Sequence, residues 1–273
     1  MDDGQGRPWL VRPGARSWAC GRSAPVRDGE VRAYHASLPG YALTPLAEVP
    51  ALAAEVGAGR VFVKDESARL GLPAFKVLGA SWAVRQVLAR HGPGGTAPPP
   101  GVAGLRALAA GWPDLVLVTA TDGNHGRAVA RMARLCGALA RVFVPAVTEP
   151  ATRAAIAAEG AEVVQVAGSY DQAVAAARRW AEGRPAAALV QDTAWPGYER
   201  IPGWIVEGYS TLFAELDAQL AAAGTGSPAL VAVPVGVGSL AQACVAHYRS
   251  AEHGSATAEG CPASGGAGRQ ADV

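Results

Sequence analysis

The sequence predicts an α/β fold in which parallel strands are covered by helices on both faces. Apolar runs of strand length alternate with helix-like patterns between residues 115 and 190, and this alternation is typical of βαβ units. Half of the 273 residues are hydrophobic and 17% are charged, so the chain can form a sizeable core. Acidic or glycine-rich segments follow several of the apolar runs, at the strand ends where open α/β sheets bind ligands.

Composition excludes several classes of function. The net charge is +1 and the basic residues are scattered, so we expect no nucleic-acid or membrane-surface partner. The acidic N-terminus has no apolar signal-peptide region, and the four cysteines have no framework spacing, so we expect a cytoplasmic protein. The apolar stretch from Val102 to Ala120 contains Arg106, Pro113 and Asp114, which argues against a membrane span.

The N-terminal third is expected to change from irregular to regular structure. Residues 1–40 are rich in Gly, Arg and Pro and are expected to be an N-terminal extension. A β-like run covers residues 60–63, and Pro73 then predicts a helix over residues 74–90 because Pro suits a helix start. Pro and Gly are abundant over residues 91–104, which indicates an exposed loop.

The rest of the chain is expected to build the sheet and its covering helices. Four apolar runs predict strands at residues 115–119, 140–144, 162–166 and 187–190. Helical patterns lie between them at residues 125–135, 149–159 and 170–182. Further on, we expect a long helix at 204–221, a buried strand at 230–233 and a helix from 239 to about 248. Residues 249–273 lack periodicity, so we expect a disordered low-complexity tail.

Lys76 falls in the first turn of the predicted helix. A cation is unfavourable there because of the helix dipole. Such a lysine either points to solvent or is required in its neutral form, in which it is a nucleophile that can form a Schiff base. Position alone favours the surface lysine, because such lysines are common in first turns.

Two acids follow buried strands, each at the end where a ligand would bind. The first strand end carries Thr121, Asp122, Gly123, Asn124 and His125. The helix that begins there offers free N–H groups to a carboxylate, so we expect Thr121, Asp122, Gly123 and His125 to bind substrate. Asp122 and Asp192 could each accept a proton from a bound substrate. The alternative for each acid is a capping role, and we expect His125 to be structural rather than a base.

A glycine-rich turn after the last apolar run provides a phosphate site. It consists of Gly236, Val237, Gly238 and Ser239, whose backbone N–H groups and following helix can bind a phosphate. The same turn satisfies Gly-x-Gly-x-x-Ala, but a dinucleotide site needs an acidic ribose ligand, and Glu259 lies in featureless sequence. A zinc site from Cys244, His247, His253 and Cys261 fits no common spacing, so no metal is expected.

The segment from Lys64 to Lys76 reads Lys-Asp-Glu-Ser-x-Arg-x-Gly-x-x-x-Phe-Lys. It resembles the way in which fold type II pyridoxal-phosphate enzymes, and the diaminopropionate ammonia-lyase family in particular, present their Schiff-base lysine. The resemblance extends from about Tyr41 to Ala243. It includes an acid at Asp122, where commoner relatives have Ser, and the segment Asp-Thr-Ala-Trp-x-Gly-Tyr that begins at Asp192.

The resemblance implies a two-lobed enzyme with pyridoxal 5'-phosphate in the cleft. The small lobe would cover residues 82–195, and the large lobe residues 41–81 with 196–248. Lys76 would hold the cofactor, Asn124 would reach its phenolic oxygen, and the turn that begins at Gly236 would bind its phosphate. Asp122 or Asp192 would remove the Cα proton. The implied reaction converts 2,3-diaminopropionate to pyruvate and ammonia.

The same resemblance carries three further expectations. Another amino-acid lyase of this fold, similar to threonine/serine dehydratase, remains an alternative activity. The family continues well beyond the glycine-rich turn, so we expect a C-terminally truncated chain that is poorly soluble and weakly active or inactive. The complete protein would act on a small amino acid as a homodimer.

Overall fold

The computed structural model describes residues 28–91 and 100–249. The chain divides into two compact units. The larger unit, Val26–Ala243, holds almost all of the described residues. The other unit contributes only Cys244–Arg249 to the described part of the chain.

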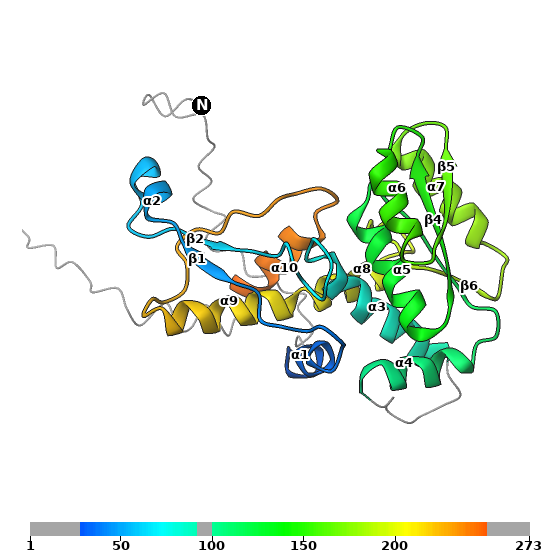
Figure 1. The fold of residues 1–273 in the computed structure, drawn as a ribbon, viewed down its shortest axis with the longest axis horizontal. Helices are drawn as coiled ribbons and strands as arrows, with labels where there is room; N and C mark the ends of the chain where they lie inside the picture. The colour runs from blue at the N-terminus through cyan, green and yellow to red at the C-terminus, as the bar shows by residue number, and fades with distance from the viewer. Residues whose placement is uncertain (1–27, 92–99, 250–273) are drawn as a thin grey trace, which may run out of the picture. The chain divides into compact units, whose positions relative to one another are not determined.

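A four-stranded parallel sheet forms one part of the larger unit (Figure 1). Its strands are β3 (Val116–Ala120), β4 (Leu139–Pro145), β5 (Glu162–Val166) and β6 (Ala187–Leu189). They lie in the order β5-β4-β3-β6, with Thr119 beside Val142 and Val142 beside Val163. All four strands were predicted from their apolar runs, each within two residues of the observed ends.

Helices cover both faces of this sheet. The helices of this part are α4 (Gly101–Ala110), α5 (Asn124–Cys136), α6 (Pro150–Ala157) and α7 (Tyr170–Ala181). Phe143 packs against Ala173 and Ala177 of α7, whereas Val142 lies against Gly126 of α5. Neighbouring strand residues point to opposite faces, so α5 and α7 lie on opposite sides of the sheet. The predicted fold class is therefore confirmed.

Helices also join this sheet to the rest of the unit. These helices are α1 (Asp28–Ala36), α3 (Lys76–His91), α8 (Arg200–Gly208) and α9 (Ser210–Ala222). α3 and α8 cross at two glycines: a Cβ on Gly208 would lie 2.7 Å from the Gly79 Cα atom. A Cβ on Gly79 would lie 2.8 Å from the carbonyl oxygen of Ile205. No side chain fits at this crossing, which fixes the helix that begins at Lys76 against α8.

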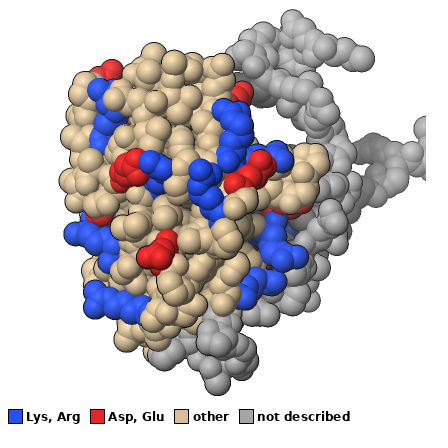
Figure 2. All heavy atoms as spheres, turned by 90° about the vertical axis from the view of Figure 1, so that its right-hand side faces the viewer, with Lys and Arg blue, Asp and Glu red and all other residues tan. Residues whose placement is uncertain are grey.

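A second, smaller sheet precedes α3. β1 (Leu46–Glu48) and β2 (Phe62–Lys64) pair antiparallel, and α2 (Pro50–Val56) lies between them in sequence. α10 (Ser239–Tyr248) follows the glycine-rich turn. Figure 2 shows one face of the molecule, on which the Lys and Arg side chains of the described residues are spread among Asp and Glu without a continuous basic patch.

Two helices occur where irregular structure was predicted. α4 occupies Gly101–Ala110 within and beyond the predicted loop. This short helix buries Leu105 and Ala109. It was not predicted because the flanking sequence is rich in Pro and Gly. α1 lies inside the predicted N-terminal extension, where it buries Val31 and His35 completely. Residues 1–27 lie outside the described part.

Two other predicted elements are also different in the structure. The helix predicted over 204–221 begins at Arg200 and is divided into α8 and α9 at Tyr209. The predicted strand at residues 230–233 does not form, and Leu230 is 84% exposed. Among the described residues no strand lies beside this segment, and an apolar run needs a hydrogen-bonded neighbour to become a buried strand. The predicted tail lies outside the described residues from 250 onwards.

No described helix has the length and apolar character that a membrane span requires. The lobe boundaries predicted at residues 81/82 and 195/196 stay predictions.

Candidate active site

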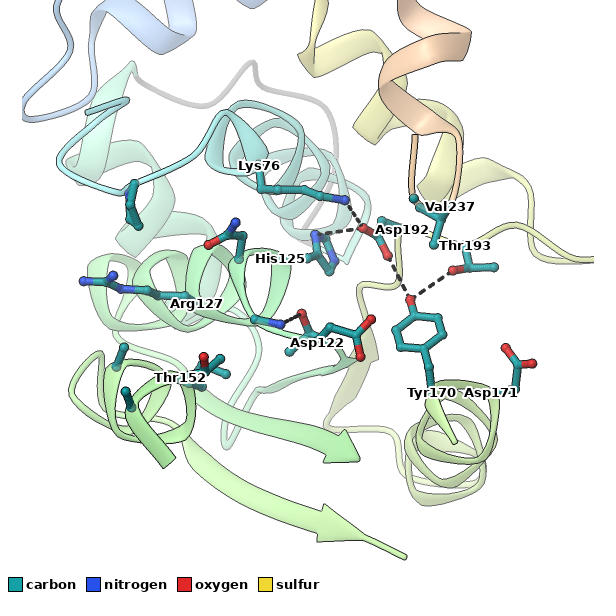
Figure 3. A pocket seen from close by; sticks show the side chains of 18 residues that line it. Lys76, Asp122, His125, Arg127, Thr152, Tyr170, Asp171, Asp192, Thr193 and Val237 are labelled. Carbon is teal, nitrogen blue, oxygen red and sulfur yellow. Dashed lines mark hydrogen bonds and ion pairs between the residues drawn. The ribbon is translucent and has the colours of Figure 1, made fainter. Parts of the chain in front are cut away.

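A cavity of about 880 Å³ lies at the carboxyl ends of the parallel strands (Figure 3). Its walls come from the segments that follow β3, β4, β5 and β6, together with the start of α3 and the glycine-rich turn. Among the predicted site residues, those that line it are Lys76, Thr121 to His125, Asp192, Gly236 and Val237. The cavity thus occupies the edge at which open α/β sheets bind ligands.

Lys76 is the first residue of α3 and extends into the cavity. Its Nζ atom donates a hydrogen bond to Asp192 Oδ2 at 2.6 Å, and its side chain is 23% exposed. The other motif lysine has a different environment. Lys64 Nζ donates to Glu215 Oε2 at 3.0 Å and to the carbonyl oxygen of Thr44 at 2.8 Å, and Lys64 does not line the cavity.

Asp192 is buried at the centre of the polar contacts in the cavity. Burial alone would raise the pKa of its carboxyl, but His125, the Lys76 ammonium and the hydrogen bond from Lys76 together hold this pKa below its usual value. Asp192 is therefore ionised at neutral pH. An ionised carboxylate next to a lysine amine can accept a proton from a bound substrate.

His125 is held by the backbone of the neighbouring strand end. Its Nε2 lies 2.8 Å from the carbonyl oxygen of Val190, so Nε2 carries the proton in the neutral ring. Nδ1 is buried, has no hydrogen-bond partner in the described part of the chain and lies 3.8 Å from Asp192 Oδ2. Burial lowers the pKa of His125 despite the nearby Asp192 carboxylate. The His125 ring thus faces Asp192 through a buried nitrogen that has no hydrogen bond among the described residues.

The segment after β3 combines a fixed backbone with exposed side chains. The N–H group of Gly123 donates to Thr121 Oγ1 at 2.9 Å. A Cβ on Gly126 would lie 2.3 Å from Thr121 Cγ2, so only glycine fits there. Asp122 and Asn124 are exposed, and both line the cavity.

The glycine-rich turn lies at another wall of the cavity. Ser239 is buried and its hydroxyl donates to the carbonyl oxygen of Asp192 at 2.9 Å. A Cβ on Gly236 or Gly238 would meet nothing within 4 Å, so open space borders the turn. The turn leads directly into α10, whose N-terminal N–H groups suit a phosphate. Gly238 and Ser239 do not themselves line the cavity.

Several lining residues were missed by sequence reasoning. They are Arg127, Thr152, Tyr170, Asp171 and Thr193. The Tyr170 hydroxyl accepts from Gln191 Nε2 at 2.9 Å and lies 3.2 Å from Thr193 Oγ1. Burial, and next the Asp192 carboxylate, raises the pKa of Tyr170. Tyr170 and Asp171 follow the end of β5, so the rule that strand ends share one edge could have found both.

A family model for pyridoxal-phosphate-dependent enzymes matches residues 38–269. The chain belongs to this family. Members of this family depend on pyridoxal phosphate. This is the cofactor that was predicted to bind Lys76 and the glycine-rich turn. The residues present fit that cofactor, because a lysine amine and an open glycine-rich turn border one cavity that is wide enough for a small ring.

Curated relatives within the pyridoxal-phosphate family include diaminopropionate ammonia-lyases. The diaminopropionate ammonia-lyase of Salmonella typhimurium is 40% identical over 226 residues, which are 80% of this chain and 54% of that protein. The Escherichia coli enzyme of the same name is 37% identical over 218 residues, or 77% of this chain and 52% of that enzyme. The predicted resemblance to diaminopropionate ammonia-lyases is confirmed. The chain spans about half the length of the curated relatives it matches.

Solved structures show the same relationship within the pyridoxal-phosphate family. Escherichia coli diaminopropionate ammonia lyase in apo form has a TM-score of 0.74 and 34% sequence identity, and the match covers 84% of this chain and 64% of that one. The same enzyme in complex with an aminoacrylate-PLP azomethine reaction intermediate has a TM-score of 0.72 and 33% identity, covering 84% and 58%. The fold type II architecture is therefore confirmed.

Proposed function

We propose that this protein is a pyridoxal-phosphate-dependent ammonia-lyase that converts 2,3-diaminopropionate to pyruvate and ammonia. The observation that carries the proposal is the presence of two carboxylates, Asp122 and Asp192, in one cavity with Lys76. Asp122 stands where the commoner relatives of this fold have Ser, which argues against a threonine/serine dehydratase. The likeness to enzymes named diaminopropionate ammonia-lyase supports the same activity.

The cofactor would be held by the residues that border the cavity. Lys76 would bind the aldehyde carbon, Asn124 would contact the ring, and the turn Gly236-Val237-Gly238-Ser239 would bind the phosphate. Thr121, Asp122, Gly123 and His125 would bind the substrate. When bound, pyridoxal phosphate withdraws electron density from the substrate Cα atom. The protein itself positions the substrate and accepts the Cα proton.

The two acids would divide the proton transfer between them. Asp122 follows β3 and Asp192 follows β6, so they approach the cavity from different strands, and in Figure 3 they lie apart with Tyr170 near both. Acids on opposite faces of a planar substrate adduct would serve opposite enantiomers. Asp192 is ionised at neutral pH because of its cationic and histidine neighbours, so it is ready to accept a proton.

The proposed activity is tested by incubating the chain with pyridoxal phosphate and measuring pyruvate release from D- and L-2,3-diaminopropionate. Release from diaminopropionate at a higher kcat/KM than from serine or threonine supports the proposal. Faster release from serine or threonine would identify the dehydratase alternative. No release from any of them, with the cofactor demonstrably bound, would indicate a catalytically impaired cofactor-binding protein.

The assembly and location of the protein are proposed on the same basis. We propose a homodimer that acts on a small amino acid in the cytoplasm, with lobes at residues 82–195 and at 41–81 joined to 196–248. Light scattering of the purified chain tests the dimer. Limited proteolysis tests the boundary at 195/196, which lies between β6 and α8 and should be cut before the sheet. The boundary at 81/82 falls within α3, where Ser81 and Trp82 are buried.

A further inference from the structure

Gln191 lies just after β6 and directly before Asp192, and its side chain is fully buried. Its Oε1 atom accepts a hydrogen bond from the backbone N–H group of Ala120 at 2.9 Å. The same oxygen accepts from Thr119 Oγ1 at 3.1 Å. Both donors belong to β3, so the Gln191 side chain is anchored to the neighbouring strand.

The amide nitrogen of Gln191 is turned toward the cavity. Nε2 donates to Asp192 Oδ1 at 3.1 Å and to the Tyr170 hydroxyl at 2.9 Å. The contact with the Ala120 N–H group fixes the two ends of the amide, because only its oxygen can accept a hydrogen bond. Gln191 therefore presents a donor, and not an acceptor, to the Asp192 carboxylate.

The two oxygens of the Asp192 carboxylate have different surroundings. Oδ1 accepts from Gln191 Nε2, whereas Oδ2 accepts from Lys76 Nζ at 2.6 Å. Figure 3 shows one oxygen between Lys76 and His125 and the other directed toward Tyr170. A carboxylate that is held at one oxygen keeps the other oxygen in place, so Oδ2 stays turned toward Lys76.

We propose that Gln191 is a positioning residue that orients the Asp192 carboxylate, so that Oδ2 faces Lys76 and the substrate. This inference rests on the proposed function, in which Asp192 accepts the Cα proton. When Lys76 leaves its ion pair with Asp192 to hold the cofactor, Gln191 is the nearest side-chain donor to the carboxylate that remains among the described residues. The Tyr170 hydroxyl is farther away, at 3.5 Å from Oδ1.

The test replaces the donor by an acceptor without changing the size of the side chain. Gln191→Glu keeps an oxygen for the Ala120 N–H group but places a second carboxyl group beside Asp192. Two carboxyl groups in contact share a proton, which they release at a raised pH. Burial alone also raises the pKa of a glutamate, so the double variant Gln191→Glu/Asp192→Asn separates the two causes. The matched control is Gln165→Glu, at an exposed position on β5.

Carbon-13 NMR of the side-chain carboxyl groups measures these titrations in the chain without added cofactor. We expect the carboxyl group introduced by Gln191→Glu to titrate about one pH unit or more higher than the same group in the double variant. Gln165→Glu should leave the titration of Asp192 unchanged. Equal titration in the single and double variants would show that Gln191 does not contact Asp192, and this result would overturn the inference.

The second readout is the pH profile of pyruvate release from each enantiomer of diaminopropionate. In Gln191→Glu the acidic limb should move to higher pH for the enantiomer that Asp192→Asn slows more, because Asp192 is a base only after the pair has lost its proton. The KM for that enantiomer should change little, and the limb for the other enantiomer should not move. An equal fall in kcat for both enantiomers, with neither limb moved, would indicate a structural role and contradict the inference.

The outcome is separable from that of the proposed function, because the NMR comparison needs no catalysis. A raised titration in Gln191→Glu that falls in the double variant supports the role of Gln191 even where no pyruvate forms. Pyruvate release together with equal titrations would support the lyase and refute the role of Gln191.

Thermal unfolding shows whether each variant is folded. If Gln191→Glu does not fold, Gln191→Met takes its place, since it adds no buried charge and removes the donor to Asp192. The Asp192 carboxyl should then titrate at a higher pH than in the wild type, because a hydrogen bond to the charged form has been lost. An unchanged Asp192 titration in Gln191→Met would overturn the inference.

Discussion

Two groups of charged side chains occur in this protein, and they differ in how completely their members are paired. The first is the buried ion cluster, formed by Lys64, Glu66, Arg69 and Glu215. Arg69 and Glu215 are fully buried, and Arg69 donates to both oxygens of Glu215 at 2.7 Å. The second group is the cavity, in which Lys76 has Asp192 as its partner while Asp122 has none among the described residues.

The same contrast appears in the two buried histidines. His35 Nδ1 lies 2.8 Å from Thr211 Oγ1, and its Nε2 lies 3.0 Å from the carbonyl oxygen of Leu78. His125 has a partner at only one ring nitrogen within the described part of the chain. Fully paired groups stabilise the fold, whereas a group with an unused donor or acceptor can bind a ligand. Within the motif from Lys64 to Lys76, Lys64 and Arg69 are paired in the buried ion cluster, whereas Lys76 lines the cavity.

The largest expected effect concerns the two motif lysines. If pyridoxal phosphate binds, borohydride reduction should fix the pyridoxyl group on the peptide that contains Lys76, and Lys76→Ala should abolish the labelling. Peptide mass spectrometry makes the measurement. Lys64→Ala is the matched control, which should lower stability but keep the label on Lys76. A label on Lys64 would show that the assignment is wrong.

The acids of the cavity are expected to have the next largest effect. Asp122→Asn and Asp192→Asn keep the side-chain size but remove a base, which typically costs about 10²–10⁴-fold in rate. If the two acids serve opposite faces, each variant should lose activity mainly on one enantiomer, as measured by pyruvate release from D- and L-diaminopropionate. Equal losses on both enantiomers from either change would contradict the two-face model.

Breaking the buried ion cluster should affect stability rather than chemistry. Glu215→Gln removes the fully buried carboxylate of the cluster and leaves Arg69 with Glu66 as its only acidic partner among the described residues. Loss of one partner of a buried pair costs about 3–5 kcal/mol. Denaturant unfolding measures the change. The control is Glu48→Gln, which removes an exposed pair with Arg60 and should change stability little. A cluster variant as stable as this control would show that the buried pairs contribute nothing.

The smallest effect is a pH dependence from His35. Burial lowers the pKa of His35 to about 3 from its ordinary 6.5, so the unfolded chain binds a proton that the folded chain does not. Its contribution to stability is present above pH 6.5 and is lost as the pH falls toward 3. By linkage, the free energy of unfolding should fall by about 2 kcal/mol between pH 7 and pH 5 from this group.

His35→Gln keeps one hydrogen bond and cannot titrate, so its unfolding free energy should depend less on pH over that range. Equal pH dependence in His35→Gln and the wild type would assign the effect to other groups.

The sequence predicted the parallel sheet well because its strands are short apolar runs between helical patterns, and both signals are local. It did not predict α4, since Pro and Gly dominate the sequence around that helix. It wrongly predicted a strand at residues 230–233. Whether Leu230 is buried depends on a neighbouring strand and not on its own segment.

The structure brings together residues that belong to continuous motifs of the sequence. Lys76, Asp122, Asp192 and Gly236 all line one cavity, and their roles stay predictions. Asp171 and Arg127 were missed because they enter the cavity from α7 and α5 without a motif of their own. The buried partner of Arg69 was also missed, since Glu215 lies 146 residues away in the chain and only the folded structure brings the two together.

The glycine pair at the crossing of α3 and α8 has a consequence for engineering. Alanine is ordinarily a safe replacement for glycine in a helix and raises helix propensity. At Gly79 or Gly208 the added methyl group would instead meet backbone atoms at 2.8 Å or less, and backbone cannot rotate away as a side chain can. Consensus or propensity-based stabilisation should therefore leave both positions unchanged, because separating the two helices would also move the lysine at the start of α3.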